Sequence, residues 1–284
     1  MMKPPMQAIE KLVRTALEED APQGDITSAS LLPADAVISA ELVAREDGVL
    51  CGEDVFAAAM RLTGPVDVSF AVHDGESFRA GAVLATVNGS AHDVLQAERV
   101  ALNFTQRLCG IATMTAKFVH ATEGLRARIT DTRKTTPGLR VLERYAVRCG
   151  GGGNHRYSLS DAVLAKDNHL AVLSASGVSL VEALREARKQ IPHTTTIEVE
   201  VDRRDQIEEA LAAGADTILL DNFSLDDLRS GVMQIAGRAL VEASGGVTLE
   251  DVRAIAETGV DLISVGALTH GVRSLDLGLD IRSV

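Results

Sequence analysis

The chain has 284 residues, a formal net charge of −12 and 46% hydrophobic residues, enough for a small domain plus an α/β barrel. The acidic balance argues against nucleic acid as a partner. No run of about 18 apolar residues predicts a membrane span, and the N-terminal segment lacks the apolar core of a signal peptide. Three scattered cysteines without CxxC spacing predict reduced thiols and a cytoplasmic protein.

The front third predicts a small mixed α/β domain. Apolar residues at helical spacing indicate a helix around residues 9–17. A longer helix is expected from Ser90, its N-cap, through about residue 104. Between them lie three strand-like runs, separated by the turn signals HDG and NG, at residues 37–45, 66–72 and 82–87.

From about residue 126 short apolar strands alternate with helical segments, which predicts parallel βαβ units. Six strands are readable, two fewer than a complete eight-stranded barrel has, at residues 128–132, 162–166, 196–201, 217–221, 239–244 and 262–266. We therefore expect two domains, residues 1–113 and residues 114–284, with the extreme C-terminus packing back on the first.

One basic stretch lies inside this acidic chain. Residues 126–156 hold eight Lys or Arg against two acids, a net charge of +6. The stretch ends beside four consecutive glycines. Such a local reversal of sign predicts a pocket for a small, multiply charged anion rather than a general affinity for polyanions.

Polar residues recur where each predicted strand ends. In a parallel barrel these ends converge on one rim, where barrel enzymes place their chemistry. The residues in question are Thr132, Arg133, Lys134, Lys166, Glu200, Asp221, Ser244, Gly245, Gly246, Gly266, Ala267 and Leu268.

The chemistry of several of these positions stays open at this point. The glycine loops after the last two strands either bind a phosphate or form plain tight turns. The Ser244–Gly246 loop would bind it through backbone N–H groups and the dipole of a helix expected to follow directly, at residues 248–259. Glu200 and Asp221 suit Mg²⁺, sugar hydroxyls or salt bridges with the basic loop. Lys166 is either a Schiff-base nucleophile or a cationic substrate contact. His155 is a hydrogen-bond donor, a base or a capping residue, and His169 is expected to hold its own loop.

The motifs DTRKTTPGLR, CGGGGNHR, AKDNH, EVEVD, ILLDNF, ASGGV and SVGALTH occur in this order along the chain. The front third adds EDAPQGDIT, HDGESFRAG and QAERVALNFTQRLCGIAT. Together they resemble the quinolinate phosphoribosyltransferase family over nearly the whole chain. The resemblance implies an incomplete parallel α/β barrel with an N-terminal mixed α/β sandwich domain. It also implies phosphoribosyl transfer from phosphoribosyl pyrophosphate to quinolinate, with loss of CO₂, in NAD biosynthesis.

The resemblance further implies residue roles. Arg99, Arg133, His155, Arg156 and Lys166 would surround quinolinate, with Thr132 nearby. Lys134, Glu200 and Asp221 would hold phosphoribosyl pyrophosphate and Mg²⁺, directly or through water. Ser244, Gly245, Gly246, Gly266, Ala267 and Leu268 would hold the 5′-phosphate. Lys134, Lys166, Glu200 and Asp221 are the expected catalytic residues.

In this family the active site lies at a dimer interface, so the resemblance implies a homodimer, or a larger assembly, in which Arg99 reaches the partner's site. Three other functions are compatible with parts of the pattern: a paralogue of another pathway, a Schiff-base aldolase using Lys166, and a non-catalytic phosphate-binding protein. The intact NHR and KDNH motifs argue against the first.

Overall fold

The computed structural model describes residues 2–282, which form two compact units. The first unit contains residues 1–116, 135–151 and 268–284, and the second contains residues 117–134 and 152–267. The chain therefore enters each unit more than once. A single boundary after residue 113 stays a prediction, and each unit is described by itself.

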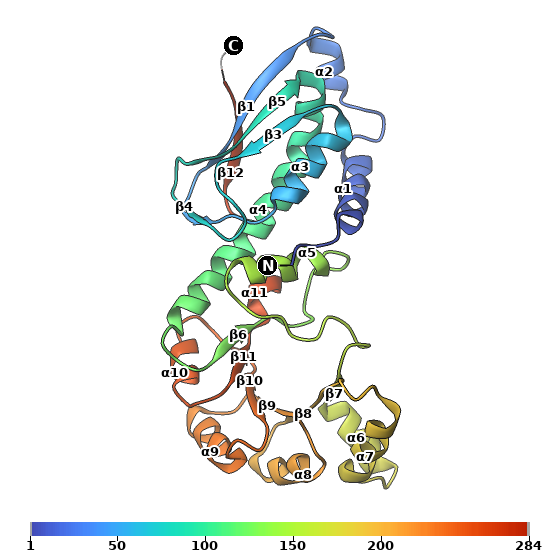
Figure 1. The fold of residues 1–284 in the computed structure, drawn as a ribbon, viewed down its shortest axis with the longest axis vertical. Coiled ribbons are helices and arrows are strands. Elements are labelled where there is room, and N and C mark those ends of the chain that lie inside the picture. The colour runs from blue at the N-terminus through green and yellow to red at the C-terminus, as the bar shows by residue number, and fades with distance from the viewer. Residues whose placement is uncertain (1, 283–284) are drawn as a thin grey trace. The chain divides into compact units, whose positions relative to one another are not determined.

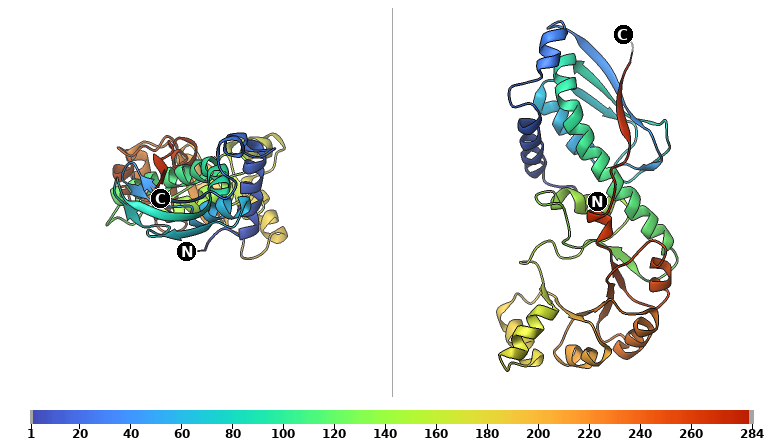
Figure 2. Two further views of the ribbon diagram at one scale, coloured as in Figure 1. Left: turned by 90° about the horizontal axis from the view of Figure 1, so that it is seen from above. Right: turned by 180° about the vertical axis from the view of Figure 1, so that it is seen from behind.

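The first unit is built on a four-stranded sheet of order β12-β1-β5-β3, with antiparallel pairing throughout. The long helix α4 lies along one face of this sheet (Figure 2). Its elements are α1 (Met6–Asp20), α2 (Ile26–Leu31), β1 (Val37–Ala44), β2 (Gly48–Val49), α3 (Glu53–Thr63), β3 (Asp67–Phe70), β4 (Ser77–Phe78), β5 (Val83–Ser90), most of α4 (Ala91–Ala121), α5 (Arg140–Cys149) and β12 (Leu277–Ile281). No helix within residues 2–282 combines the length and apolar character needed to span a membrane.

The Asn88–Gly89 pair, expected to be a turn, lies instead inside β5. Asn88 pairs with Ser39 of β1 and with Asp67 of β3, so the strand continues through it. A Cβ at Gly89 would lie 3.0 Å from Val66 Cγ2. The glycine is thus used for close approach of a neighbouring segment rather than for chain reversal.

The second unit is a six-stranded parallel sheet, as predicted. The strand order is β6-β11-β10-β9-β8-β7, and within the described residues the edge strands β6 and β7 do not pair, so the barrel is open. Helices α6 to α10 cover its outer face (Figure 1). The elements are β6 (Arg128–Thr130), β7 (Val163–Ala165), α6 (Asp167–Ala175), α7 (Leu180–Gln190), β8 (Ile197–Val201), α8 (Ile207–Ala212), β9 (Thr217–Asp221), α9 (Leu225–Ile235), β10 (Leu240–Ser244), α10 (Val252–Ala256) and β11 (Leu262–Ser264), with the short α11 (Ala267–His270) spanning the junction of the units.

Side chains alternate along these strands because successive residues point to opposite faces of a sheet. In β8, Ile197, Val199 and Val201 are buried and apolar, whereas Glu198 and Glu200 occupy the alternate positions. The apolar set forms the core beneath the helices. The alternate set faces the interior of the open barrel, and it is this set that lines the site.

Candidate functional site

A pocket of about 390 Å³ lies within the second unit and collects nine of the fifteen predicted site residues. These nine are Thr132, Arg133, Lys134, His155, Arg156, Lys166, Glu200, Asp221 and Ser244. Leu164, Leu219, Glu242 and Ser264 also line it. The pocket therefore joins residues that lie up to 132 positions apart in the chain.

The strands β8, β9 and β10 place their acidic and hydroxyl side chains in one row. Asp221 pairs with Ser244 across β9 and β10, and Glu200 pairs with Leu219 across β8 and β9. Glu200 therefore lies opposite the residue two positions before Asp221, on the same face of the sheet. Both carboxylates line the same pocket.

Lys166 follows β7 and donates to Glu200. Its backbone N–H donates to Nδ1 of His169 at 3.0 Å, so His169 holds this turn as predicted. The amino group is the cationic half of an ion pair, whereas a Schiff-base lysine needs a free, desolvated amine. This contact favours the reading of Lys166 as a cationic contact for an anion.

The loop that carries His155 and Arg156 is fixed by one buried carboxylate. Asp131, fully buried just after β6, accepts hydrogen bonds from Asn154 Nδ2 at 2.6 Å and from the His155 backbone N–H at 2.8 Å. Hydrogen bonds to a buried carboxylate are charge-assisted and strong. Asp131 thus joins the two halves of the basic stretch at the edge of the pocket.

His155 contacts two buried glutamates on the barrel floor. Its Nε2 lies 3.1 Å from Glu198 Oε2 and 3.6 Å from Glu242 Oε1. Burial lowers the pKa of His155, but the hydrogen bond to Glu198 and the charges of Glu242 and Glu198 outweigh it and raise the pKa overall. Nδ1 accepts from the Arg156 N–H at 2.7 Å, which opposes protonation, yet two nearby carboxylates outweigh one neutral donor.

Glu242 is only 2% exposed, and burial together with the charge of Glu198 raises its pKa to about 7. His155 and a hydrogen bond from Ser264 act in the opposite direction. The proton that Glu242 keeps up to neutral pH lessens the repulsion between the two carboxylates. The three groups therefore act as one unit whose charge depends on pH near neutrality.

Two guanidinium groups lie in the same pocket. Burial and the charge of Arg133 lower the pKa of Arg156, while the guanidinium stays ionised at neutral pH. Arg156 is also oriented by donation to the Ala162 carbonyl at 2.8 Å. Two partly buried cations that repel one another form a site that a dianion stabilises.

The glycine loop after β10 differs in one respect from the prediction. Gly245 and Gly246 have φ of +100° and +57°, and a Cβ at Gly245 would lie 2.1 Å from Asn222 Oδ1. Only glycine fits such a backbone. However, α10 begins at Val252 rather than directly after the glycines, so the expected contribution of a helix dipole at this loop is wrong. What the loop offers an anion is its backbone N–H groups.

The remaining predicted residues divide between the units. Gly245, Gly246, Gly266 and Ala267 belong to the same unit as the pocket, in the loops after β10 and β11, whereas Arg99 and Leu268 belong to the other unit. Arg99 is exposed on α4, and Leu268 is buried.

Sequence reasoning missed Glu242, which lines the pocket, and Glu198, which contacts His155 beside it. Each lies within a short strand whose other residues are mostly apolar, in IEVEV and LVEAS. A buried strand rarely tolerates a carboxylate without a charged partner. That pattern, read beside the nearby histidine motif, was the signal available in the sequence.

Two sets of residues are chemically suited to a divalent cation. Glu200 and Asp221 offer carboxylate oxygens on neighbouring strands, the donor type that Mg²⁺ prefers, and within the described residues they form no three-ligand cluster with a third His, Cys, Asp or Glu. That arrangement suits an ion that keeps waters and bridges to phosphate. His155, Glu198 and Glu242 do cluster, but their ligand atoms already pair with one another.

We predict that Glu242→Gln stabilises the protein at alkaline pH. Because the folded-state pKa is raised, the stability due to protonated Glu242 is full below its unfolded pKa of about 4.5 and is lost as pH rises through about 7. Glutamine mimics the protonated acid, so the variant should gain about 2–3 kcal/mol over the parent at pH 8 and little at pH 5. Thermal unfolding across this range, with exposed Glu257→Gln as the control, tests this; a difference independent of pH would contradict it.

The chain was compared with known proteins. The model of the quinolinate phosphoribosyl transferase C-terminal domain matches residues 111–280, and that of the N-terminal domain matches residues 25–109. A "nicotinate-nucleotide pyrophosphorylase [carboxylating]" of Mycobacterium leprae is 44% identical, over 96% of this chain and 97% of that protein. A "probable" enzyme of the same name from Bacillus subtilis is 42% identical, over 96% and 93%. The solved nicotinate-nucleotide pyrophosphorylase of Francisella tularensis superposes with a TM-score of 0.92 at 38% identity, over 99% of this chain and 98% of that one.

A helix-backed antiparallel sheet in the first unit, and an open α/β barrel with a charged pocket in the second, define a phosphoribosyltransferase of the barrel class. The chain belongs to the quinolinate phosphoribosyltransferase family.

Proposed function

We propose that the pocket of the barrel unit is where the chain transfers a phosphoribosyl group from phosphoribosyl pyrophosphate to quinolinate. The products are nicotinate mononucleotide, pyrophosphate and CO₂, a step of NAD biosynthesis. The observation that carries this assignment is one pocket lined both by the cations Arg133, Arg156 and Lys166 and by the carboxylates Glu200 and Asp221. Such a pocket matches a dicarboxylate and a phosphorylated sugar that meet in one place.

Arg133 and Arg156 bind the two carboxylates of quinolinate, assisted by Lys166, and Thr132 borders this end. Guanidinium groups suit the task because their planar fork grips a carboxylate with two parallel hydrogen bonds. The repulsion between the two arginines is relieved when the dianion enters. His155 contributes to the positive potential while Glu198 and Glu242 hold its ring.

Lys134, Glu200 and Asp221 bind the ribose and pyrophosphate end. As pyrophosphate departs, the sugar gains oxocarbenium character, and Glu200 and Asp221 stabilise that positive charge while Lys134 neutralises the leaving group. The backbone of Ser244–Gly246 and of Gly266–Leu268 holds the 5′-phosphate. Fixed positions for both substrates convert an encounter of two molecules into a reaction within one complex.

Loss of CO₂ follows from the bond just formed. Once the ring nitrogen carries the ribose it is cationic, and its charge stabilises the electron pair that stays on the adjacent carbon when the carboxylate leaves as CO₂. A proton from water then forms the C–H bond of nicotinate mononucleotide at that carbon. Arg133 and Arg156 hold the ring so that this carboxylate can leave. Mg²⁺, held by Glu200 and Asp221 directly or through water, supplies charge neutralisation for pyrophosphate when bound.

The test is the reaction itself, with quinolinate, phosphoribosyl pyrophosphate and Mg²⁺. Nicotinate mononucleotide and CO₂ should appear in equal amounts. Nicotinate has one carboxylate and would leave a buried cation without a partner. We therefore predict a kcat/KM for nicotinate ~10-fold to ~100-fold lower than that for quinolinate. Comparable turnover of nicotinate would overturn the assignment, and borohydride trapping of a carbonyl substrate on Lys166 would favour an aldolase.

We also place the enzyme in the cytoplasm as a homodimer in which Arg99 enters the pocket of the partner. The three cysteines are buried thiols that are not joined in a disulfide, as expected of a protein from a reducing compartment. Arg99 is exposed on α4, so its side chain is available to a second copy.

Co-expression of Arg99→Ala and Asp221→Asn chains tests the shared site. Each variant alone should form inactive dimers. A mixed dimer has one site with both changes and one with neither, so random assembly should restore about a quarter of the parent activity. Recovery near zero, with mixed dimers verified by tags, would show that Arg99 acts within its own chain, whereas an active Arg99→Ala dimer would show that Arg99 has no catalytic role.

A further inference from the structure

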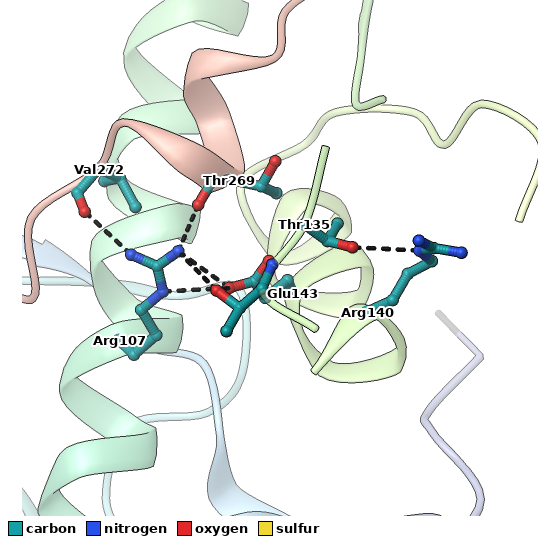
Figure 3. A network of polar contacts seen from close by, with 7 residues as sticks. Arg107, Thr135, Arg140, Glu143, Thr269 and Val272 are labelled. Carbon is teal, nitrogen blue, oxygen red and sulfur yellow. Dashed lines mark hydrogen bonds and ion pairs between the residues drawn. The ribbon is translucent and has the colours of Figure 1, made fainter. Parts of the chain in front are cut away.

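A buried ion pair in the first unit joins three segments that are distant in sequence (Figure 3). Arg107 of α4 donates to Glu143 of α5 through Nε at 3.1 Å and through a terminal nitrogen at 2.9 Å. Glu143 has no exposed surface. The same guanidinium donates to the carbonyl of Val272 at 3.0 Å and to the carbonyl of Thr269.

Glu143 extends this network to the loop that precedes α5. It accepts from the backbone N–H of Thr136 at 3.0 Å and from the Thr136 hydroxyl at 2.8 Å. Each nitrogen of the Arg107 guanidinium and both oxygens of Glu143 therefore make a hydrogen bond. A buried pair held by this many hydrogen bonds is geometrically specific, because any displacement leaves a charge uncompensated.

The two segments held by the pair continue directly from proposed substrate loops. Thr136 comes two residues after Lys134, and Thr269 comes one residue after Leu268. At both places the chain has just passed from the second unit into the first. A second contact holds the later segment to α4, since Leu275 N–H donates to the Gln106 carbonyl at 2.9 Å.

We propose that Arg107 and Glu143 are positioning residues for catalysis. The pair fixes the C-terminal ends of both the Thr132–Lys134 loop and the Gly266–Leu268 loop. It thereby keeps the groups that bind the dicarboxylate and the groups that bind the 5′-phosphate in a fixed position relative to each other. This inference rests on the proposed function. It assigns a role to residues that touch neither substrate, because they act through Thr136 and Thr269.

The decisive variants are Thr136→Val and Thr136→Ser. Thr136 is exposed, and its replacement by valine removes the hydroxyl bond to Glu143 while leaving the ion pair and the backbone N–H bond in place. Valine deletes the hydroxyl while conserving shape; serine retains it. We expect Thr136→Val to lower kcat/KM about tenfold for both substrates, with an unchanged melting temperature, and Thr136→Ser to restore it. The matched control is Arg273→Ala, in the same segment as Thr269. It breaks a surface ion pair with Glu46 and should keep full activity.

Glu143→Gln retains the shape and should lower kcat/KM further, about a hundredfold. If Glu143→Gln does not fold, the comparison of Thr136→Val with Thr136→Ser alone tests the positioning role. A Thr136→Val enzyme with parent kcat/KM overturns the positioning role. A parent protein that makes no nicotinate mononucleotide overturns instead the proposed function, so the two failures are distinguishable.

Discussion

Arg133→Ala should lower kcat/KM for quinolinate by about three orders of magnitude. The guanidinium lies partly buried in the pocket, next to that of Arg156. Removing one partner of a buried charge pair costs about 2–5 kcal/mol, and here the bound dicarboxylate would lose its cationic partner. Most of the loss should appear in KM for quinolinate, with KM for phosphoribosyl pyrophosphate nearly unchanged.

Two further variants make this measurement specific. Arg133→Lys retains the charge but not the bidentate fork, so it should recover only part of the loss. Arg238→Ala breaks an exposed pair with Glu208 on the same unit and should be neutral. Retention of a tenth or more of the parent efficiency by Arg133→Ala would exclude Arg133 from the quinolinate site.

Asp221→Asn should lower kcat by about 100-fold to 1000-fold, the range found when a charge that stabilises a transition state is removed. The variant should fold normally, because Asp221 is only half-buried and its carboxylate contacts just the neighbouring Asn222 side chain at 2.7 Å among the hydrogen bonds described for residues 2–282. Asparagine keeps the shape and an oxygen but not the negative charge. The dependence on Mg²⁺ concentration should shift upward as well.

Kinetics and melting temperature measured together decide this prediction. Exposed Asp226→Asn, at the start of α9, is the control. An Asp221→Asn enzyme with near-parent kcat and an unchanged Mg²⁺ dependence would move both roles to Glu200 or to another group. A large fall in melting temperature would mean that the carboxylate is structural.

The residues at the rim of the barrel were predictable because the spacing of apolar residues in the strands and in the helices indicates the same alternating β/α order. Apolar strands separated by amphipathic helices set the parallel sheet, and the carboxyl ends of parallel strands must share one edge. Arg133, Lys166, Glu200 and Asp221 therefore came together without any knowledge of side-chain geometry. Glu242, which lines the pocket, and Glu198, which contacts His155, were not found, since they become visible only when the inward positions of each strand are compared across the sheet.

Other differences between the predicted and the observed structure have equally local causes. The Asn88–Gly89 pair reads as a turn from its composition, but pairing on both sides of β5 overrides that preference. Helix α10 is confined to Val252–Ala256 although the pattern suggested a longer one. The interleaving of the two units cannot be derived from periodicity, because it depends on contacts such as that between Arg107 and Glu143.

The pairing of β12 with β1 has a consequence for biosynthesis. Residues 277–281 complete the edge of the first sheet, yet they are synthesised after the whole of the second unit. During translation Val37–Ala44 can pair with β5 on one side only, and its other edge stays unpaired while the roughly 190 residues between β5 and β12 are added. The nascent chain thus carries an unprotected strand edge until β12 emerges.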